Sequence, residues 1–295
     1  MSVIQYTASS RHRLTGIISG LIAATIWGLW PVITRFGVTT QFTPDEIVVV
    51  RFLFAGIVLL PYYFKNKVYR RVGILPSLLI STGAGAVYVY VSSLGLKYVP
   101  AGHLGVVETG TMLALSALGG VIFLKERKTI GQITGYFIVF SGMLLISWQS
   151  LQSTNTDSIR GDLLLVLGGI LWALYTLLTK KWEISAWDAV ATVAVWSLAI
   201  WVPLLILYGN VNYSLDYTIP WIMQGIGQGI IAAVLGLWFY SIAVNNLGAG
   251  QGSLFGALVP VIAVLGGFIF LGEPPTTYEV VGVTLTTAGI FAAVR

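Results

Sequence analysis

The chain is organised as ten long apolar segments separated by short polar connections. About 20 predominantly apolar residues are needed for a helix to cross a bilayer, and each segment comes close to this length or exceeds it. The longest connections, at residues 149–160 and 209–219, leave no room for a domain outside the membrane. The pattern predicts an all-α polytopic membrane protein with ten transmembrane helices. We place them at residues 14–34, 44–64, 73–95, 100–124, 129–148, 161–180, 187–208, 220–244, 249–271 and 276–294.

One stretch of sequence occurs twice, about half a chain apart. Residues 118–126 are LGGVIFLKE and residues 265–273 are LGGFIFLGE, and two glycines follow each glutamate at matching spacings: Gly135 and Gly142, and Gly282 and Gly289. We predict two five-helix repeats, residues 1–150 and 151–295, that form one structural unit. Because five is an odd number, the second repeat enters the membrane from the opposite face, so the repeats are inverted and enclose a central cavity.

The distribution of lysine and arginine predicts the orientation. With a cytoplasmic N-terminus, twelve of the 16 Lys and Arg residues fall on the cytoplasmic side, and only Arg35, Lys97 and Arg160 fall on the outer side. Short cytoplasmic loops are enriched in positive charge. We therefore expect both termini in the cytoplasm. This topology accounts for the net charge of +5, so we expect no nucleic-acid partner.

The composition excludes several classes of function. Charged residues make up 9% of the chain, whereas a soluble domain has about 25%. With no cysteine, two histidines and no P-loop, HExxH or GxSxG motif, the chain offers no convincing catalytic set and no ATP site. We expect a carrier rather than an enzyme, with no cofactor and no metal. A channel is disfavoured because rings of like charge and a carbonyl filter loop are missing.

We take three strongly polar ionisable side chains to lie inside the spans rather than at their ends: Arg51, His103 and Glu108. A charge at the centre of a membrane helix costs about 2.5–3.5 kcal/mol on insertion scales, so each is expected to face protein or water. Arg51 and Glu108 fall at a similar depth, roughly 10–12 Å below the outer ends of their helices. They are candidates for a structural ion pair, or for a shared water-filled cavity that binds a zwitterionic substrate or couples a proton. For His103 we expect a solvated or capping role near the outer surface, with coupling as the alternative.

Aromatic residues recur at matching places in the two halves. Tryptophan and tyrosine usually gather near span ends, but several here lie well inside their spans. Such residues carry a polar N–H or O–H that a cavity satisfies, and they offer flat apolar faces to a ligand. Each one taken alone is also explained by helix packing, and only one of Tyr88 and Tyr90 is expected to point inward. The candidate substrate-binding set is Trp27, Trp30, Tyr88, Tyr90, Glu108, Trp172, Tyr175, Trp238 and Tyr240.

Two prolines are candidates for moving parts. Pro31 and Pro260 lie within predicted spans, where proline removes a backbone hydrogen bond and can kink the helix, either as a gate or as a tolerated bend. Glu126 and Glu273 belong to the repeated stretch but fall at span ends. We expect them to cap the fold rather than to bind substrate.

Together these features resemble the EamA-type ten-helix exporters of the drug/metabolite transporter superfamily. The resemblance rests on Trp27 with Trp30-Pro31, on LGLKYVPAG at 94–102, and on the two LGG blocks with their glutamates and glycines. It implies a basket of helices around a central cavity, peripheral fifth and tenth helices, and alternating access without ATP. The aromatic residues are most similar to those of bacterial exporters of aromatic and other neutral amino acids, which implies a location in the bacterial cytoplasmic (inner) membrane.

The alternative within transport is a broad drug or metabolite exporter, possibly coupled to protons. Four-helix drug exporters of the superfamily carry a carboxylate in the first span, and the first span here has none. This difference favours a neutral or zwitterionic solute. The solute, the driving ion, the transport direction and the oligomeric state are left open by the sequence.

Overall fold

The computed structural model describes residues 10–125, 129–152, 156–212, 218–247 and 254–294, and every element in these ranges is helical. The helices of the first half are α1 (Ser10–Thr40), α2 (Pro44–Lys65), α3 (Val68–Val72), α4 (Ile74–Ala84), α5 (Ala86–Leu96), α6 (Ala101–His103), the π-helical η1 (Leu104–Glu108), α7 (Thr109–Leu124) and α8 (Ile130–Gln152).

The second half begins with α9 and ends with α16. Its helices are α9 (Thr156–Lys181), α10 (Ala186–Trp196), the π-helical η2 (Ser197–Trp201), α11 (Val202–Tyr208), α12 (Thr218–Gln224), the π-helical η4 (Gly225–Leu235), α13 (Gly236–Leu247), the 3₁₀ turn η5 (Leu254–Ala257), α15 (Leu258–Leu271) and α16 (Thr277–Val294).

Within the described residues, all ten predicted spans coincide with helical structure. Seven helical segments of the described chain are long and apolar enough to cross a membrane, and Ile130–Ile146 and Phe255–Leu271 are shorter apolar helices. The tenth predicted span falls on α16. In the described residues, five spans are not uninterrupted α-helices. The third is broken at Gly85, the fourth, seventh and eighth contain π-helical segments, and the ninth contains the 3₁₀ turn η5.

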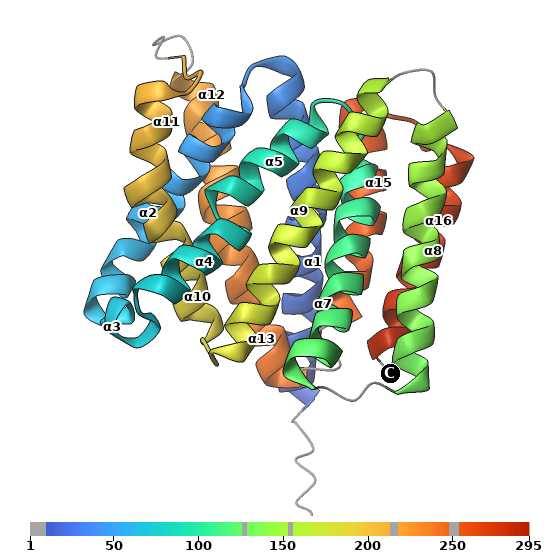
Figure 1. Cartoon of the computed structure of the whole chain (residues 1–295), viewed down its shortest axis with the longest axis horizontal. Helices are drawn as coiled ribbons and strands as arrows, with labels where there is room; N and C mark the ends of the chain where they lie inside the picture. The colour runs from blue at the N-terminus through green and yellow to red at the C-terminus, as the bar shows by residue number, and fades with distance from the viewer. Residues whose placement is uncertain (1–9, 126–128, 153–155, 213–217, 248–253, 295) are drawn as a thin grey trace, which may run out of the picture.

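The helices form one bundle (Figure 1). α1 packs against α13 and α15, α2 packs against η4 and α10, and α9 packs against α4, α5 and α7. α1 and α9 run in opposite directions through the bundle, as expected for the first helices of two inverted repeats (Figure 1). α8 and α16 lie side by side at one edge, antiparallel to each other, in the peripheral positions that the resemblance implies.

The repeated glycines form the contact between α8 and α16. A Cβ atom on Gly142 would lie 2.7 Å from the carbonyl oxygen of Gly282, and one on Gly289 would lie 2.7 Å from that of Gly135. Both distances are too short for a side chain, so the two backbones approach as closely as small residues allow. The duplicated spacing therefore places one glycine pair of each repeat against the other.

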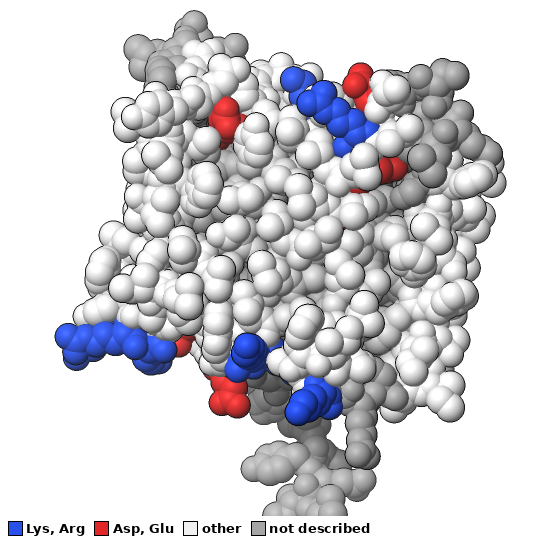
Figure 2. Space-filling model, viewed as in Figure 1, with Lys and Arg blue, Asp and Glu red and all other residues white. Residues whose placement is uncertain are grey.

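Charged side chains gather at the two ends of the bundle. Figure 2 shows a broad uncharged band between them on the visible face, as a bilayer-spanning surface requires. The first turn of α1 and the last turn of α16 lie at the same end of the bundle, drawn as the lower end in Figure 1. The opposite end, where α5 finishes and α16 begins, is called the upper end below. Which end faces the cytoplasm stays a prediction.

Candidate functional site

The site is built around a break in the third span. Gly85 separates α4 from α5, with backbone angles of φ −96° and ψ −141° that leave the helical region. A Cβ atom there would lie 2.1 Å from the Ser81 carbonyl oxygen and 2.5 Å from Ser197 Oγ, so glycine is required. The freed N–H of Ala86 donates to Ser197 Oγ at 3.2 Å. Broken helices mark substrate sites in many transporters, and this one places Tyr88 in the first turn of α5.

Glu108 is the acidic centre of the site. Its side chain is buried, and it accepts hydrogen bonds of 2.6 Å from the hydroxyls of Tyr88 and Ser92. These two donors lie four residues apart and therefore share one face of α5. Gly168 of α9 makes room for the carboxylate, since a Cβ atom there would lie 2.5 Å from Glu108 Oε2. Glu108 also ends the π-helical η1, and π-helical turns are frequent at functional sites.

Gln228 organises a second, basic centre. Its amide oxygen accepts from Trp30 Nε1 at 2.7 Å and from Arg51 Nη1 at 3.3 Å, and its nitrogen donates to Thr34 Oγ1 at 2.9 Å and to Gln224 Oε1 at 3.4 Å. The Arg51 guanidinium carbon lies 5.2 Å from the Trp30 ring centroid, within cation–π range. Arg51 Nε is buried without a hydrogen-bond partner. The basic centre thus holds a donor that an anionic group can engage.

Aromatic rings join the two centres. The Trp30 and Tyr88 rings are stacked with centroids 6.0 Å apart, Tyr88 meets Trp172 edge-on at 4.8 Å, and Trp172 lies 5.6 Å from Tyr175. These residues come from α1, α5 and α9, so both halves of the chain contribute. We call the set the central cluster: Trp30, Arg51, Tyr88, Glu108, Trp172, Tyr175 and Gln228.

Part of the predicted set lies apart from the central cluster. Trp27 and Tyr240 form their own pair with ring centroids 5.3 Å apart, and Trp27 Nε1 donates to the Ala232 carbonyl at 3.2 Å. Tyr90 and Trp238 are 36% and 45% exposed. Tyr90 turns away because Tyr88 occupies the inward face of α5, and the Trp238 ring lies against Phe239.

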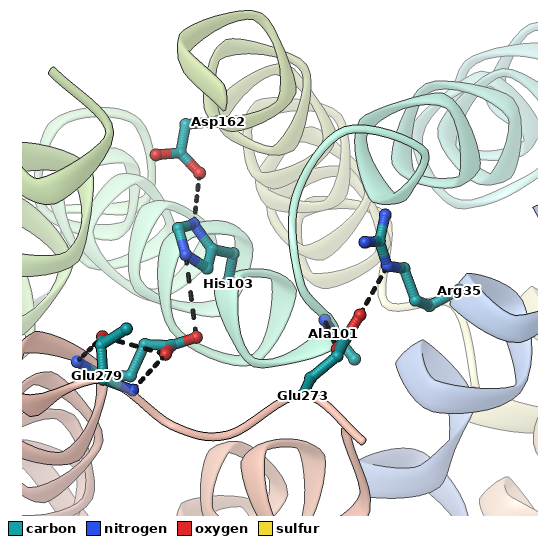
Figure 3. A network of polar contacts seen from close by, with 7 residues as sticks. Arg35, Ala101, His103, Asp162, Glu273 and Glu279 are labelled. Atoms are coloured by element: carbon teal, nitrogen blue, oxygen red, sulfur yellow. Dashed lines mark hydrogen bonds and ion pairs between the residues drawn. The ribbon is translucent and has the colours of Figure 1, made fainter. Parts of the chain in front are cut away.

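The charged residues also differ from expectation. Arg51 and Glu108 share one cluster but form no ion pair with each other. Glu108 accepts from the Tyr88 hydroxyl, and Arg51 lies over the Trp30 ring on which Tyr88 stacks. The solvated or capping role expected for His103 is wrong. Its side chain is buried, and its ring contacts Asp162 and Glu279 (Figure 3).

Glu273 behaves as expected of a capping residue. Its carboxylate accepts from Arg35 Nε at 2.8 Å and from the Ala101 N–H, at the start of α6, at 3.1 Å (Figure 3). Glu126, its counterpart in the first half, lies outside the described residues.

Both prolines lie within helices. α1 continues through Pro31 to Thr40. Pro260 is the third residue of α15, which directly continues the 3₁₀ turn η5. A kink at Pro260 and a gating role for either proline stay predictions.

Sequence reasoning missed Gln228, Ser92, Asp162 and Glu279. Gln228 is fully buried and lies between Gly225 and Gly229 in the eighth span, so an amide in an otherwise apolar stretch was the available signal. Asp162 and Glu279 fall close to predicted span ends, where an acidic residue is ordinary.

A cavity of about 670 Å³ opens beside the basic centre. It lies between α1, the α12–η4 segment and α15, and most of its lining is apolar. Gln224 forms part of its wall and bonds to Gln228, so the polar network of the central cluster reaches this cavity.

Known proteins resemble this chain over most of its length. The EamA-like transporter family matches residues 14–148 and again residues 159–295. "Uncharacterized transporter YyaM" of Bacillus subtilis (strain 168) is 29% identical over 68% of this chain and 66% of that protein.

Two further relatives have names that describe a solute. A "Probable terminal-alkyne amino-acid exporter" of Streptantibioticus cattleyicolor is 27% identical, over 71% of this chain and 69% of its own length. The "Probable glucose uptake protein GlcU" of Bacillus anthracis is 24% identical, over 63% of this chain and 66% of its own length.

One solved crystal structure superimposes on 95% of this chain and 96% of its own, with a TM-score of 0.63 and 16% sequence identity, which shows a shared fold. The family match covers nearly the whole described chain, in two copies that correspond to its two halves. The chain therefore belongs to the EamA-like transporter family and is a multi-pass membrane transporter.

Proposed function

We propose that this transporter is a secondary carrier that exports small neutral amino acids, above all aromatic ones. It works by alternating access in the cytoplasmic membrane, with both termini in the cytoplasm. The observation that carries the proposal is the central cluster, in which a buried cation and a buried carboxyl group lie on either side of stacked aromatic rings. An aromatic amino acid presents the complementary groups: a carboxylate, an ammonium and an apolar ring.

Each centre suits one of these groups. Arg51 has a free Nε donor, and a guanidinium is the side chain best suited to bind a carboxylate. Glu108 is held by two hydroxyl donors and supplies the negative partner for an ammonium. Trp30, Tyr88 and Trp172 provide the aromatic surface between them. Because these groups are almost wholly buried, binding and release require the bundle to open, as alternating access does.

The names of the relatives point to different classes of solute, so the solute of this chain has to be decided by experiment. One is named an amino-acid exporter and another a glucose uptake protein. The central cluster favours the amino acid, because glucose carries no charge to match Arg51 or Glu108. Burying unmatched charged groups against a neutral sugar would leave their hydration uncompensated.

Counterflow in liposomes tests the proposal. Purified protein is reconstituted into vesicles loaded with unlabelled solute, and uptake of labelled phenylalanine, leucine, glucose and a lipophilic cation is compared. We expect saturable counterflow of the two amino acids and none of glucose or the cation. Counterflow of glucose or the cation alone would replace the proposal with a sugar carrier or a drug exporter, and linear, unsaturable flux would indicate a channel.

A further inference from the structure

A second buried polar group lies at the upper end of the bundle, apart from the central cluster. The His103 ring sits between two carboxylates, with Nδ1 2.8 Å from Asp162 Oδ1 and Nε2 3.8 Å from Glu279 Oε1 (Figure 3). All three side chains are at least nine-tenths buried. They come from α6, α9 and α16, so they join the first half of the chain to the second. We call these three residues the histidine cluster.

The geometry of the histidine cluster can accommodate an extra proton. A neutral imidazole carries one N–H and one acceptor nitrogen, so it can donate to only one of two carboxylates. The other nitrogen would then direct its lone pair at a carboxylate oxygen. Protonation of the ring, or of a carboxyl group, removes this repulsion. Asp162 Oδ2 is also buried without a hydrogen-bond partner, so the cluster as it stands is short of hydrogen-bond donors.

The surrounding charged groups do not balance this deficit. Arg35 of α1 pairs with Glu273, which follows α15, and Arg160 of α9 lies over the Tyr98 ring at 5.0 Å. No Lys or Arg in the described part of the chain forms an ion pair with Asp162 or Glu279. Glu279 gains only neutral donors, the N–H and hydroxyl of Thr276. Two carboxylates therefore face one imidazole, and a bound proton is the available counter-charge.

The histidine cluster also links α6 to the second half of the chain. The short α6 is fixed at its first residue by Glu273, which accepts from the Ala101 N–H, and at its last residue by the contacts of His103. Both sets of contacts run from the first half of the chain to groups of the second half. If the halves separate at the upper end, these contacts have to break.

We propose that the histidine cluster is a proton-binding site whose occupancy stabilises the closed arrangement of the upper end. A doubly protonated imidazole donates to Asp162 and attracts Glu279, and so joins α6 to α9 and α16. Loss of the proton leaves a donor for only one partner and adds uncompensated negative charge, which favours separation. The upper end therefore closes in acid and opens in alkali, through a site distinct from the one that binds substrate.

The distance between the two halves at the upper end tests this inference. The 295-residue chain has no cysteine, so Lys97→Cys on the α5 side and Tyr278→Cys on α16 provide two specific spin-label positions. Both native side chains are exposed. In nanodiscs, pulsed electron–electron double resonance measures the distance between the two labels. The measurement is repeated from about pH 5 to pH 8, the range in which imidazoles change charge. We expect the long-distance population to grow at least about twofold over this range.

Two variants decide whether the histidine cluster causes the change. His103→Gln keeps a donor but cannot gain a proton, so the distance distribution should no longer depend on pH. Glu273→Gln is the matched control. It weakens the contact between Glu273 and the Ala101 N–H of α6 without removing the imidazole, so the closed population falls but still responds to pH. A native distribution that does not change with pH, or a His103→Gln variant that retains the full response, overturns the proposal.

Asp162→Asn provides a second test, independent of whether His103→Gln folds. Removing this carboxylate removes part of the attraction that favours the protonated ring. The closed population at a given pH should then fall, so that the upper end opens at lower pH. An unchanged or higher transition pH in a folded Asp162→Asn protein contradicts the proposal.

Discussion

Tyr88 and Glu108 are joined by a 2.6 Å hydrogen bond from the phenol to Oε1, while the tyrosine ring stacks on Trp30. One side chain thus links the acidic centre to the aromatic face that continues to Arg51. Because Tyr88 follows the Gly85 break directly, a rearrangement of the broken span would act on both centres together. This connection makes Tyr88 the residue on which substrate affinity should depend most specifically.

Tyr88→Phe should weaken substrate affinity without unfolding the protein. The change keeps the ring stack and removes one hydrogen bond to a carboxyl group, worth about 1.5–3 kcal/mol, which corresponds to a rise in KM of roughly 10- to 100-fold. Counterflow kinetics measure this shift. Tyr90→Phe, two residues along α5 and partly exposed, is the control and should leave KM unchanged. Equal effects of the two substitutions would show that the hydroxyl of Tyr88 has no special role.

Gln228→Leu should destabilise the fold by leaving Arg51 and Trp30 without their shared acceptor. An unsatisfied buried polar group costs about 1–3 kcal/mol, and more when the group is charged. Replacing both partners by apolar groups is close to neutral, so Gln228→Leu combined with Arg51→Leu should recover part of the lost thermal stability. Unfolding in detergent measures both effects. Additive losses in the double variant would show that the two side chains do not depend on each other.

Gly168→Ala should displace Glu108. Its new Cβ would lie 2.5 Å from Glu108 Oε2, and such overpacking costs about 1–3 kcal/mol. Counterflow should therefore fall together with thermal stability. Gly227→Ala is the control, because the nearest side-chain atoms to a Cβ there lie at 3.8 Å, an ordinary contact. If both alanine variants behave alike, the close packing of α9 against the carboxylate is not what fixes Glu108.

Gly142→Ala should destabilise the α8–α16 edge by a similar amount. The methyl group would meet the Gly282 carbonyl oxygen at 2.7 Å, and backbone cannot move aside as a flexible side chain can. Gly131→Ala on the same helix has its nearest contacts at 3.9 Å and should be neutral or slightly stabilising, because alanine favours helix over glycine. Thermal unfolding of the two variants separates packing from helix propensity. A neutral Gly142→Ala would contradict the role assigned to the repeated glycines.

The features that depend on periodicity and repetition were predictable from the sequence. Apolar segments of membrane-spanning length indicated the helices, and the repeated glutamate–glycine spacing indicated a duplication. The structure places the repeated glycines at the contact between α8 and α16. The sequence also pointed to Arg51, Glu108, Trp30, Tyr88, Trp172 and Tyr175, because polar or amphipathic groups deep in apolar helices need a reason to be there.

Contacts between distant helices were not predictable in the same way. His103, Asp162 and Glu279 each lie near the end of a helix, where a single sequence gives no sign that three such ends converge. The hydrogen bonds of Gln228 likewise depend on how η4 is wound against α1 and α2. The break at Gly85 was hidden because the flanking residues are as apolar as those of an unbroken span.

Binding of charge-deleted ligands to purified protein tests most directly whether the central cluster is the substrate site. Phenylalanine is compared with 3-phenylpropionate, which lacks the ammonium group, in the native protein and in Glu108→Gln. We predict that the native protein binds phenylalanine at least about tenfold more tightly, and that Glu108→Gln binds the two ligands almost equally. Equal binding of both ligands by the native protein, or full discrimination in the Glu108→Gln variant, would contradict the account.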